Sequence, residues 1–297
     1  MTISTSLWYN RSNSAMQTLT AKTDTLSTQI STGKKLQAPS DDPVAYAQLR
    51  GLAVANADGT AYGKNLDTAA SLLSTADTTL KSIGDQITRA QELALQVNNG
   101  TFADQDRGAM AEALLGIVDS LASLGNTQDA RGLPLFGDSA GTPAVTKAAD
   151  GSYSFASGPV TAIPIGDGQT IQAGTNAARV FQSGSTNILQ AITDLATALQ
   201  GGGDLGDAGD TAISAIQTGS DQVNTLQASI GARASRIELE QSVQTSAASQ
   251  REVSRSGLED TDLTAAITEL QKTMTILSAT QASFTKLQSL SLFDYLK

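Results

Sequence analysis

The sequence predicts a mainly α fold: an elongated antiparallel helical rod with paired N- and C-terminal helices and a small β-rich insertion domain. Both ends of the chain show apolar residues that alternate three and four positions apart, and such a stripe requires a partner helix. Residues 131–184 are instead rich in Gly, Pro and Thr with short β-branched runs, a composition typical of hairpins. A chain that closes through its two ends is typical of a building block, which favours assembly over catalysis.

The first helix is predicted over residues 1 to about 36. Only Thr23 interrupts its apolar stripe, and Gly33 follows the last apolar position, where glycine commonly ends a helix. The residues of this first stripe are Met16, Leu19, Leu26 and Ile30.

The second helix is predicted to begin at Asp42-Pro43. Asp42 is a good N-cap, and Pro43 at the first helical position loses no needed hydrogen bond. The pair Asp41-Asp42 could also be interpreted as a metal or acid–base site, but its place between two prolines favours capping. We expect a break near Asp58-Gly59. The later part carries the longest uninterrupted stripe, made of Leu66, Ala69, Leu73, Ala76, Leu80, Ile83, Ile87, Ala90, Ala94 and Val97.

A third helix is expected to pack antiparallel on the second. Asn98-Asn99-Gly100 would turn the chain, and Thr101 with Asp104 resembles a capping box. The apolar positions of this helix are Met110, Leu114, Ile117, Leu121 and Leu124.

The insertion is predicted to hold short strands at 153–155, 160–163 and 170–172, with a hairpin turn at 166–168. Helix should resume near Asn187 and end at the glycines of 201–203. The Gly/Asp-rich stretch 201–210 is a single copy, so it predicts a helix–helix loop rather than a calcium-binding β-roll.

Two helices complete the predicted rod. The first covers about 207–256, with Ile213, Ile216, Val223, Leu226, Ile230 and Ile237 on its inward face. Ser256-Gly257 is expected to break it. The last helix is expected to start over residues 258–262, where acidic side chains in the first turn are stabilised by the positive end of the helix dipole. The last stripe consists of Leu263, Ile267, Leu270, Met274, Leu277, Phe284, Leu287 and Leu290.

Three domains follow from this order of elements. They are a terminal coiled-coil domain (1–42 with 258–297), a helical rod domain (43–130 with 185–257) and a β-rich outer domain (131–184).

The terminal helices have too little burial to fold alone. One apolar stripe packed against one partner helix offsets little of the conformational entropy that is lost when the chain becomes ordered. The terminal helices are therefore predicted to stay mostly unfolded in the free monomer and to fold against neighbouring subunits.

The composition of the chain argues against several classes of function. Lys and Arg total 19 against 29 Asp and Glu, and the net charge of -10 argues against binding nucleic acid or an anionic membrane. The chain has no Cys and no His, which excludes thiolate or imidazole metal sites and Ser-His or Cys-His nucleophile pairs. We expect no membrane-spanning segment, because the longest apolar stretches are far too short to span a bilayer, and no cleavable secretory signal is visible in the first residues. No catalysis, cofactor or metal is expected.

Three short motifs resemble the bacterial flagellin superfamily. Pro43 and Val44 stand where flagellins have an alanine pair, which favours the hook-associated protein 3 branch. The sequence of residues 259–262 is closer to that of flagellin itself. Residues 131–184 carry no motif that is specific to either branch. The motifs are Ser31-Thr32-Gly33-Lys34-Lys35, Pro39-Ser40-Asp41-Asp42-Pro43 and Leu290-Ser291-Leu292-Phe293.

The resemblance implies a structural role as a ring of copies that joins the flagellar hook to the filament. It implies contacts with a neighbouring junction protein on the hook side and with flagellin on the filament side. It also implies export to the extracellular flagellum without a cleaved signal peptide, after a chaperone has covered the C-terminal stripe. Two alternatives stay open: a flagellin that builds the filament itself, and an adhesive or glycan-binding role of the insertion.

Overall fold

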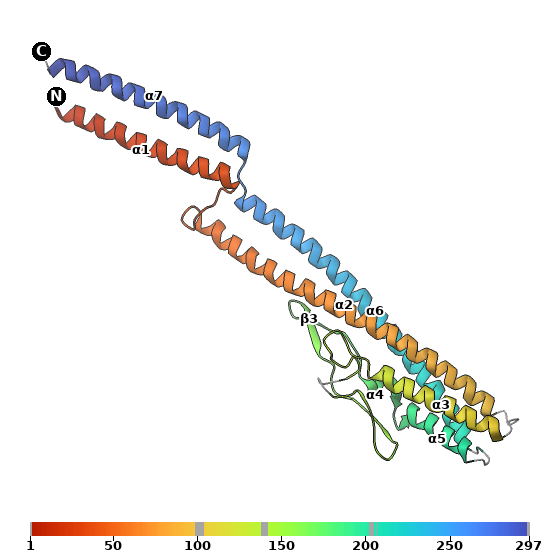
Figure 1. Ribbon diagram of the computed structural model, residues 1–297. Coiled ribbons are helices and arrows are strands. Elements are labelled where there is room, and N and C mark those ends of the chain that lie inside the picture. Colours follow the sequence, from red (N-terminus) through yellow and green to blue (C-terminus); the bar gives the residue numbers. More distant parts are fainter. Residues whose placement is uncertain (1, 99–103, 138–141, 202–204, 206, 296–297) are drawn as a thin grey trace. The chain divides into compact units, whose positions relative to one another are not determined.

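The computed structural model describes residues 2–98, 104–137, 142–201, 205 and 207–295, and the side chains of these except 2–6, 104–105 and 287–295. It confirms a mainly α fold with a small β-rich insertion (Figure 1). The helices are α1 (Thr2–Thr32), α2 (Pro43–Asn98), α3 (Asp104–Gly125), α4 (Ala177–Phe181), α5 (Ile188–Gln200), α6 (Asp207–Glu259) and α7 (Leu263–Tyr295). The strands are β1 (Val145–Lys147), β2 (Tyr153–Phe155), β3 (Ala162–Gly166), β4 (Gln169–Gln172), β5 (Gln182–Ser183) and β6 (Thr186–Asn187).

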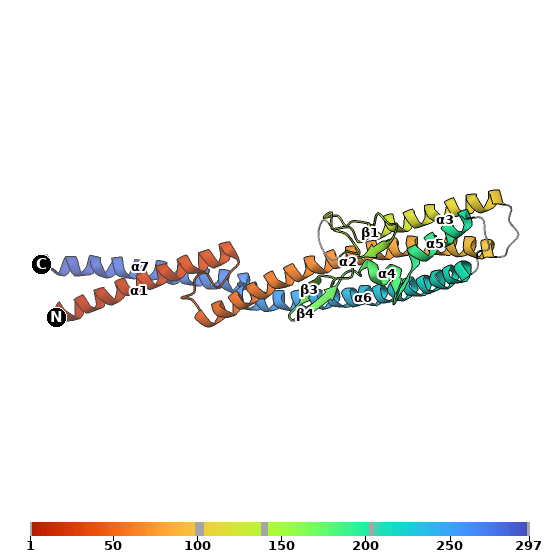
Figure 2. The same cartoon turned by 90° about the horizontal axis from the view of Figure 1, so that it is seen from below.

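The chain forms two compact units, 1–58 with 246–297 and 59–245. In the first unit, α1 and α7 lie side by side and run antiparallel, which confirms the predicted pairing of the terminal helices (Figures 1 and 2). Lys22 of α1 forms an ion pair with Glu269 of α7. The three-domain division of the sequence analysis stays a prediction.

The glycine stop predicted for the first helix and the start predicted for the second helix are confirmed, and α1 ends at Thr32, slightly earlier than the predicted limit of about 36. Gly33 adopts a φ of +72°, a conformation that favours glycine, and its N–H donates to Gln29 O over 2.8 Å. Pro43 is the first residue of α2, and Asp42 Oδ1 accepts hydrogen bonds from the N–H groups of Val44 (3.0 Å) and Ala45 (2.9 Å). Asp42 is therefore a helix cap.

Two predicted helix breaks are wrong. α2 passes through Asp58-Gly59 without interruption, because one interior glycine costs only about 1 kcal/mol relative to Ala and the long stripe beyond it more than offsets that. α6 likewise passes Gly257 and ends at Glu259. The last helix begins later than predicted, at Leu263, because Asp262 Oδ1 caps it by accepting from the N–H groups at 264 and 265, each over 3.0 Å.

The second unit has a conventional buried core. α2 and α6 run antiparallel within it, as the hydrogen bonds Gln91–Gln217 (3.0 Å) and Gln241–Asp67 (3.1 Å) show. α3 and α5 pack beside them (Figure 2). The predicted α2 stripe from Leu66 to Val97 is buried at all ten positions. The predicted faces of α3 and α6 are also inside: Leu114, Ile117, Leu121, Ile216, Val223, Leu226, Ile230 and Ile237 are buried, and Met110, Leu124 and Ile213 are partly buried.

The insertion consists of three separate antiparallel hairpins, β1–β2, β3–β4 and β5–β6. Gly168, with a φ of +64°, forms the predicted turn between β3 and β4. The strand predicted from Val160 begins only at Ala162. Gly125 marks a close approach, because a Cβ there would lie 2.6 Å from Val145 Cγ2. The core of the helices and the hairpins is therefore continuous within this unit.

Some predictions fall outside the described residues: the turn at 99–101 with the capping box of Thr101, and the glycines 202–203. Within the described part, one helical segment, Asp106–Gly125, has the length and hydropathy of a membrane span, in contrast to our expectation. Its apolar residues Leu114, Ile117 and Leu121 belong to the core of the second unit, so we assign it to that core.

Candidate assembly interface

The stripe of α1 lies on the side of the helix that packs against α7. Met16, Leu19, Leu26 and Ile30 are each half-buried, and Thr23 completes the line between them. None of these side chains is fully buried. The two-helix pair thus covers this stripe only in part, because no third helix packs on it within the described unit.

The stripe of α7 divides into two lines. The line that faces α1 contains the buried residues Ala266 and Thr273, with Leu270, Leu277 and Phe284 half-buried. Small side chains at 266 and 273 let the two helices approach closely. Thr273 Oγ1 donates to Glu269 O over 2.7 Å, so its hydroxyl is satisfied inside the pair.

The other line remains open to solvent. Leu263, Ile267 and Met274 are 46%, 43% and 52% exposed, and we call these three residues the open α7 stripe. At 100° per residue they lie within 40° of one another on the helix surface. The open α7 stripe is therefore the part of the predicted α7 stripe that the pairing with α1 leaves exposed, and its role in assembly stays a prediction. The side chains of Leu287 and Leu290 lie outside the described ones.

Further apolar residues of the terminal pair are exposed. Leu7, Trp8 and Tyr9 of α1 and Ile276 of α7 all have large exposed fractions. The three-four pattern does not mark Ile276, because it lies on another side of α7. Trp8 and Tyr9 both contact the ring of Phe284, at centroid distances of 6.0 and 5.0 Å.

Asp41 shapes the connector between α1 and α2 through hydrogen bonds to the backbone. Its Oδ2 accepts hydrogen bonds from the N–H groups of Ala38 and Gln37, each over 2.9 Å. These bonds, the one from Ala38 above all, hold the pKa of Asp41 below its ordinary value. The neighbouring Asp42 caps α2, so the two carboxylates have separate local roles and form no shared site.

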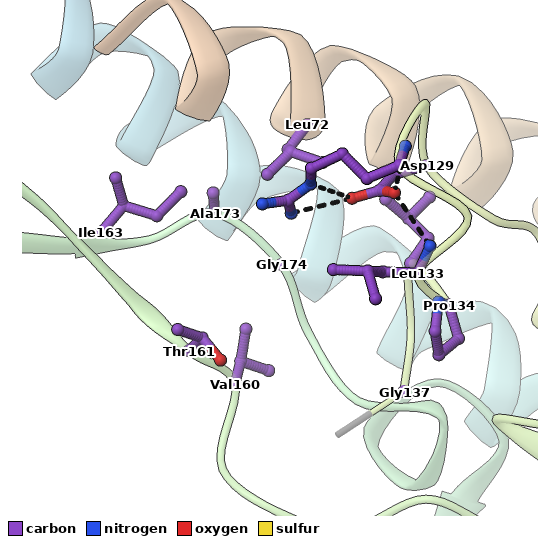
Figure 3. Close-up of a pocket in the computed structure, with 12 residues that line it drawn as sticks. Leu72, Asp129, Leu133, Pro134, Gly137, Val160, Thr161, Ile163, Ala173 and Gly174 are labelled. Atoms are coloured by element: carbon purple, nitrogen blue, oxygen red, sulfur yellow. Dashed lines mark hydrogen bonds and ion pairs between the residues drawn. The ribbon is translucent and has the colours of Figure 1, made fainter. Parts of the chain in front are cut away.

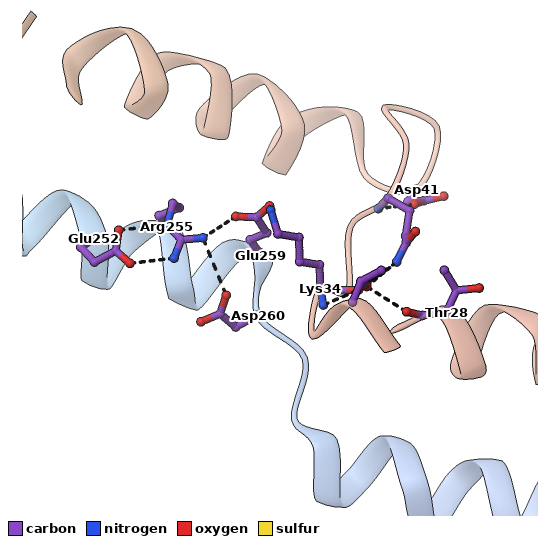
Figure 4. Close-up of polar contacts among 9 residues, drawn as sticks. Thr28, Lys34, Asp41, Glu252, Arg255, Glu259 and Asp260 are labelled. Carbon is purple, nitrogen blue, oxygen red and sulfur yellow. Dashed lines mark hydrogen bonds and ion pairs between the residues drawn. The ribbon is translucent and has the colours of Figure 1, made fainter. Parts of the chain in front are cut away.

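A group of charges close to this connector was not predicted from the sequence. Lys34, Arg255 and Glu259 come together there, and Arg255 also holds Glu252 (Figure 4). The spacing of 252, 255 and 259 on one helix could have indicated the pairs within α6. The partner of Glu259 in the first connector is more than two hundred residues away in sequence, and no local pattern indicates it.

A recess of about 270 Å³ lies at the base of the insertion in the second unit (Figure 3). Leu72, Leu133, Val160 and other apolar residues line it, and Arg131 is held by Asp129 at its edge through bonds of 2.8 and 3.0 Å. Burial alone would raise the pKa of Asp129, but hydrogen bonds from the N–H of Leu133 and from Arg131 hold it below its ordinary value. Among the described residues, the lining carries no aromatic platform for a sugar and no nucleophile beside a base.

The comparisons with known proteins all match this chain to flagellar proteins. The model of the bacterial flagellin N-terminal helical region matches residues 3–140. Flagellar hook-associated protein 3 of Salmonella typhimurium is 28% identical, and the match covers 99% of this chain and 99% of that protein. The protein of the same name from Escherichia coli is 27% identical over 100% of both. Flagellin of Listeria monocytogenes is 26% identical over 82% of this chain and 80% of its own.

Solved structures have the same fold. A protein described as a flagellar hook-associated protein, from Vibrio parahaemolyticus, superposes with a TM-score of 0.69 at 25% identity, over 74% of this chain and all of that one. Flagellar hook-associated protein 3 of Legionella pneumophila gives a TM-score of 0.63 at 11% identity, over 70% of this chain and 98% of its own, which shows the fold alone. The chain is therefore similar to the bacterial flagellin N-terminal helical region over residues 3–140, and its likeness to flagellar hook-associated protein 3 extends along its whole length.

Proposed function

We propose that this chain is a structural component of the bacterial flagellum and forms the junction between hook and filament. The observation that carries the proposal is the end-to-end match to two proteins named flagellar hook-associated protein 3. The flagellin matches cover less of both chains. The role is structural, with neither catalysis nor a cofactor, and it places the protein in the extracellular flagellum.

The terminal helices supply the assembly surface in this proposal. The open α7 stripe and the exposed aromatic residues of α1 leave large apolar side chains in water on a pair that buries only Ala266 and Thr273 fully among the described side chains. Copies of this chain in a ring would cover them through a head-to-tail contact, which need not close as a dimer would. Further axial contacts would go to the neighbouring junction protein on the hook side and to flagellin on the filament side.

Before assembly the same surface needs protection. An exposed apolar stripe on a chain that waits for its partners is an aggregation risk. A chaperone that covers α7 until export, and export without a cleaved signal peptide, complete the proposal. Both follow from the resemblance of the chain to the flagellar proteins.

Deletion of the gene tests the role in cells. We expect hooks to remain while flagellin is lost into the medium, and a plasmid copy to restore filaments. A copy carrying Ile267→Glu and Met274→Glu should fail to restore them, because both charges fall on the open α7 stripe. The matched control is Ala279→Glu, an exposed position on the other side of the same helix. Normal filaments in the deletion strain would reject the junction role.

A flagellin that builds the filament is the second candidate, favoured by the 26% identity to Listeria flagellin. Purified protein added to hook–filament seeds separates the two. A junction protein adds a short segment and stops, whereas a flagellin elongates into long filaments.

A further inference from the structure

Two connectors meet in the first unit although they lie far apart in sequence. One follows α1 (33–42) and the other joins α6 to α7 (260–262). The N–H of Lys35 donates to Glu259 O over 2.7 Å, and the N–H of Thr261 donates to Gly33 O over 2.8 Å. Lys34 and Asp260 thereby form a one-residue antiparallel bridge. The end of α1 and the start of α7 are thus tied together by backbone bonds.

Charged side chains reinforce this bridge (Figure 4). The Glu259 carboxylate accepts a hydrogen bond from the Lys34 ammonium and a second, of 2.6 Å, from Arg255 Nη1. Arg255 in turn holds Glu252 with two bonds, Nη2–Oε1 (2.6 Å) and Nε–Oε2 (3.0 Å). The side chain of Glu259 is only 15% exposed, so water screens its pairs less than it screens ordinary surface ion pairs.

The backbone around Lys34 is fixed from other directions as well. Gln29 Nε2 donates to Lys35 O over 3.1 Å, and Lys35 Nζ donates to Gly257 O over 2.9 Å. Gly33 supplies the left-handed turn that points the chain toward α6. We call Lys34, Arg255 and Glu259 with the two backbone bonds of the bridge the connector latch.

We propose that the connector latch is a positioning device from which the pairing of α1 and α7 begins. It holds the last residues of α1 beside the first residues of α7, so the two helices start antiparallel and in register. Pairing then spreads from the latch toward the chain ends. This inference rests on the proposed function only in that assembly is what makes the pairing of these helices useful.

The terminal pair needs such a device because it is weak on its own. Starting a helix is unfavourable, and a pair that buries few side chains barely offsets the entropy of ordering it. Two segments that are tethered next to each other meet at a far higher effective concentration than two free ends. The latch supplies that tether through Glu259, whose carboxylate contacts both Lys34 of the first connector and Arg255 of α6.

The test uses the full-length monomer in dilute solution, so its result does not depend on where the protein sits in a flagellum. The chain has no cysteine, so nitroxide labels go only on introduced ones. Thr28→Cys on α1 and Thr264→Cys on α7 are exposed positions within two turns of the latch. Dipolar electron paramagnetic resonance then reports the fraction of molecules with a short, narrow distance between the labels.

We expect Glu259→Gln to reduce the ratio of paired to unpaired molecules about fivefold, the size of losing one partly shielded charged bond. Lys34→Gln should have a similar effect, the double variant should add little to either, and Lys34→Arg should keep the pairing. The matched control is Lys22→Gln, which removes an ion pair of similar chemistry at 49% and 37% exposure within the helix pair and should change the ratio little.

Amide protection in the α2 stripe of the second unit shows that each variant is folded. An unchanged distance distribution in Glu259→Gln would overturn the proposal. An effect of Lys22→Gln as large as that of Glu259→Gln would also overturn it, because the ion pair of the latch would then contribute no more to the pairing than another ion pair between the two helices.

Discussion

Trp8 and Phe284 stack with their ring centroids 6.0 Å apart and their planes 14° from parallel, although they lie near opposite ends of the chain. This contact lies on the terminal pair, far along α1 and α7 from the connector latch. Both side chains remain partly open to water. The described parts of α1 and α7 therefore contact each other through these rings and leave other apolar side chains exposed, which a neighbouring copy would cover in the proposed assembly.

Removing the ring of Phe284 should weaken the terminal pair. Phe284→Ala loses the contacts with Trp8 and Tyr9, and an aromatic pair of this kind contributes about 1 kcal/mol. We expect lower helicity by circular dichroism in the assembled protein on mild heating. Phe284→Tyr keeps a ring at the position and should behave as the parent protein. Equal helicity of the Ala variant and the parent would show that the stacking contributes nothing.

The close approach of α1 and α7 at Ala266 makes a second prediction. Ala266 is 6% exposed, so Ala266→Leu should overpack the pair by about 1–3 kcal/mol. Ala265→Leu is the matched control, since the neighbouring residue is exposed and the same substitution there should be tolerated. Sedimentation of assembled rings measures the difference. If both variants assemble alike, α1 does not pack against this face of α7.

Acid should loosen the connector latch. The hydrogen bond from Lys34, and to a smaller extent the one from Arg255, holds the pKa of Glu259 below its ordinary value of 4.5. A lowered folded-state pKa means that the stabilisation is complete above the unfolded value and is lost as the pH falls through the folded one. Besides these two partners, Lys35, Glu252 and Asp260 lie around the group.

The paired fraction of the Thr28–Thr264 label pair should therefore be constant above about pH 5 and fall below pH 4.5. Glu259→Gln should flatten much of this acid response. Glu269→Gln, which removes the carboxylate that Lys22 holds, serves as the comparison, because the pKa of Glu269 is also lowered. A Glu259→Gln profile that keeps the full acid response would place the titrating group elsewhere.

Substitutions in the core of the second unit should lower the stability of the monomer, whereas substitutions in the open α7 stripe should impair assembly. Ile83 is fully buried in the second unit, so Ile83→Ala should lower the free energy of unfolding of the monomer by about 2–5 kcal/mol. Met274 is 52% exposed, so Met274→Ala should change it by less than about 0.5 kcal/mol and still impair ring formation. Denaturant unfolding and sedimentation give the two readouts. A large loss of monomer stability in Met274→Ala would mean that α7 folds against its own chain.

The buried positions of a helix could be predicted from the sequence where its apolar stripe is long and unbroken. The α2 positions from Leu66 to Val97 are all inside, because ten apolar residues in register leave one possible inner face. The helix ends at Gly33 and Asp42 also followed from local chemistry. Such features depend on neighbours in sequence, so they can be predicted from it.

Other features depend on contacts that no local pattern carries. On α7, the inner line through Ala266 and Thr273 and the outer line through Ile267 and Met274 are adjacent on the helix surface. Which one faces α1 is decided by how closely the backbones approach. The pairing of Lys34 with Glu259 likewise requires the fold to bring two connectors together.

The central claim is that the terminal helices complete their burial only through neighbouring copies. Amide hydrogen exchange at Leu270 and Leu277 tests it most directly, in the free monomer and in assembled rings. We predict fast exchange at both amides in the monomer and strong protection after assembly, while Leu73 in the second unit is protected in both. Strong protection at Leu270 and Leu277 in a dilute monomer would contradict the claim.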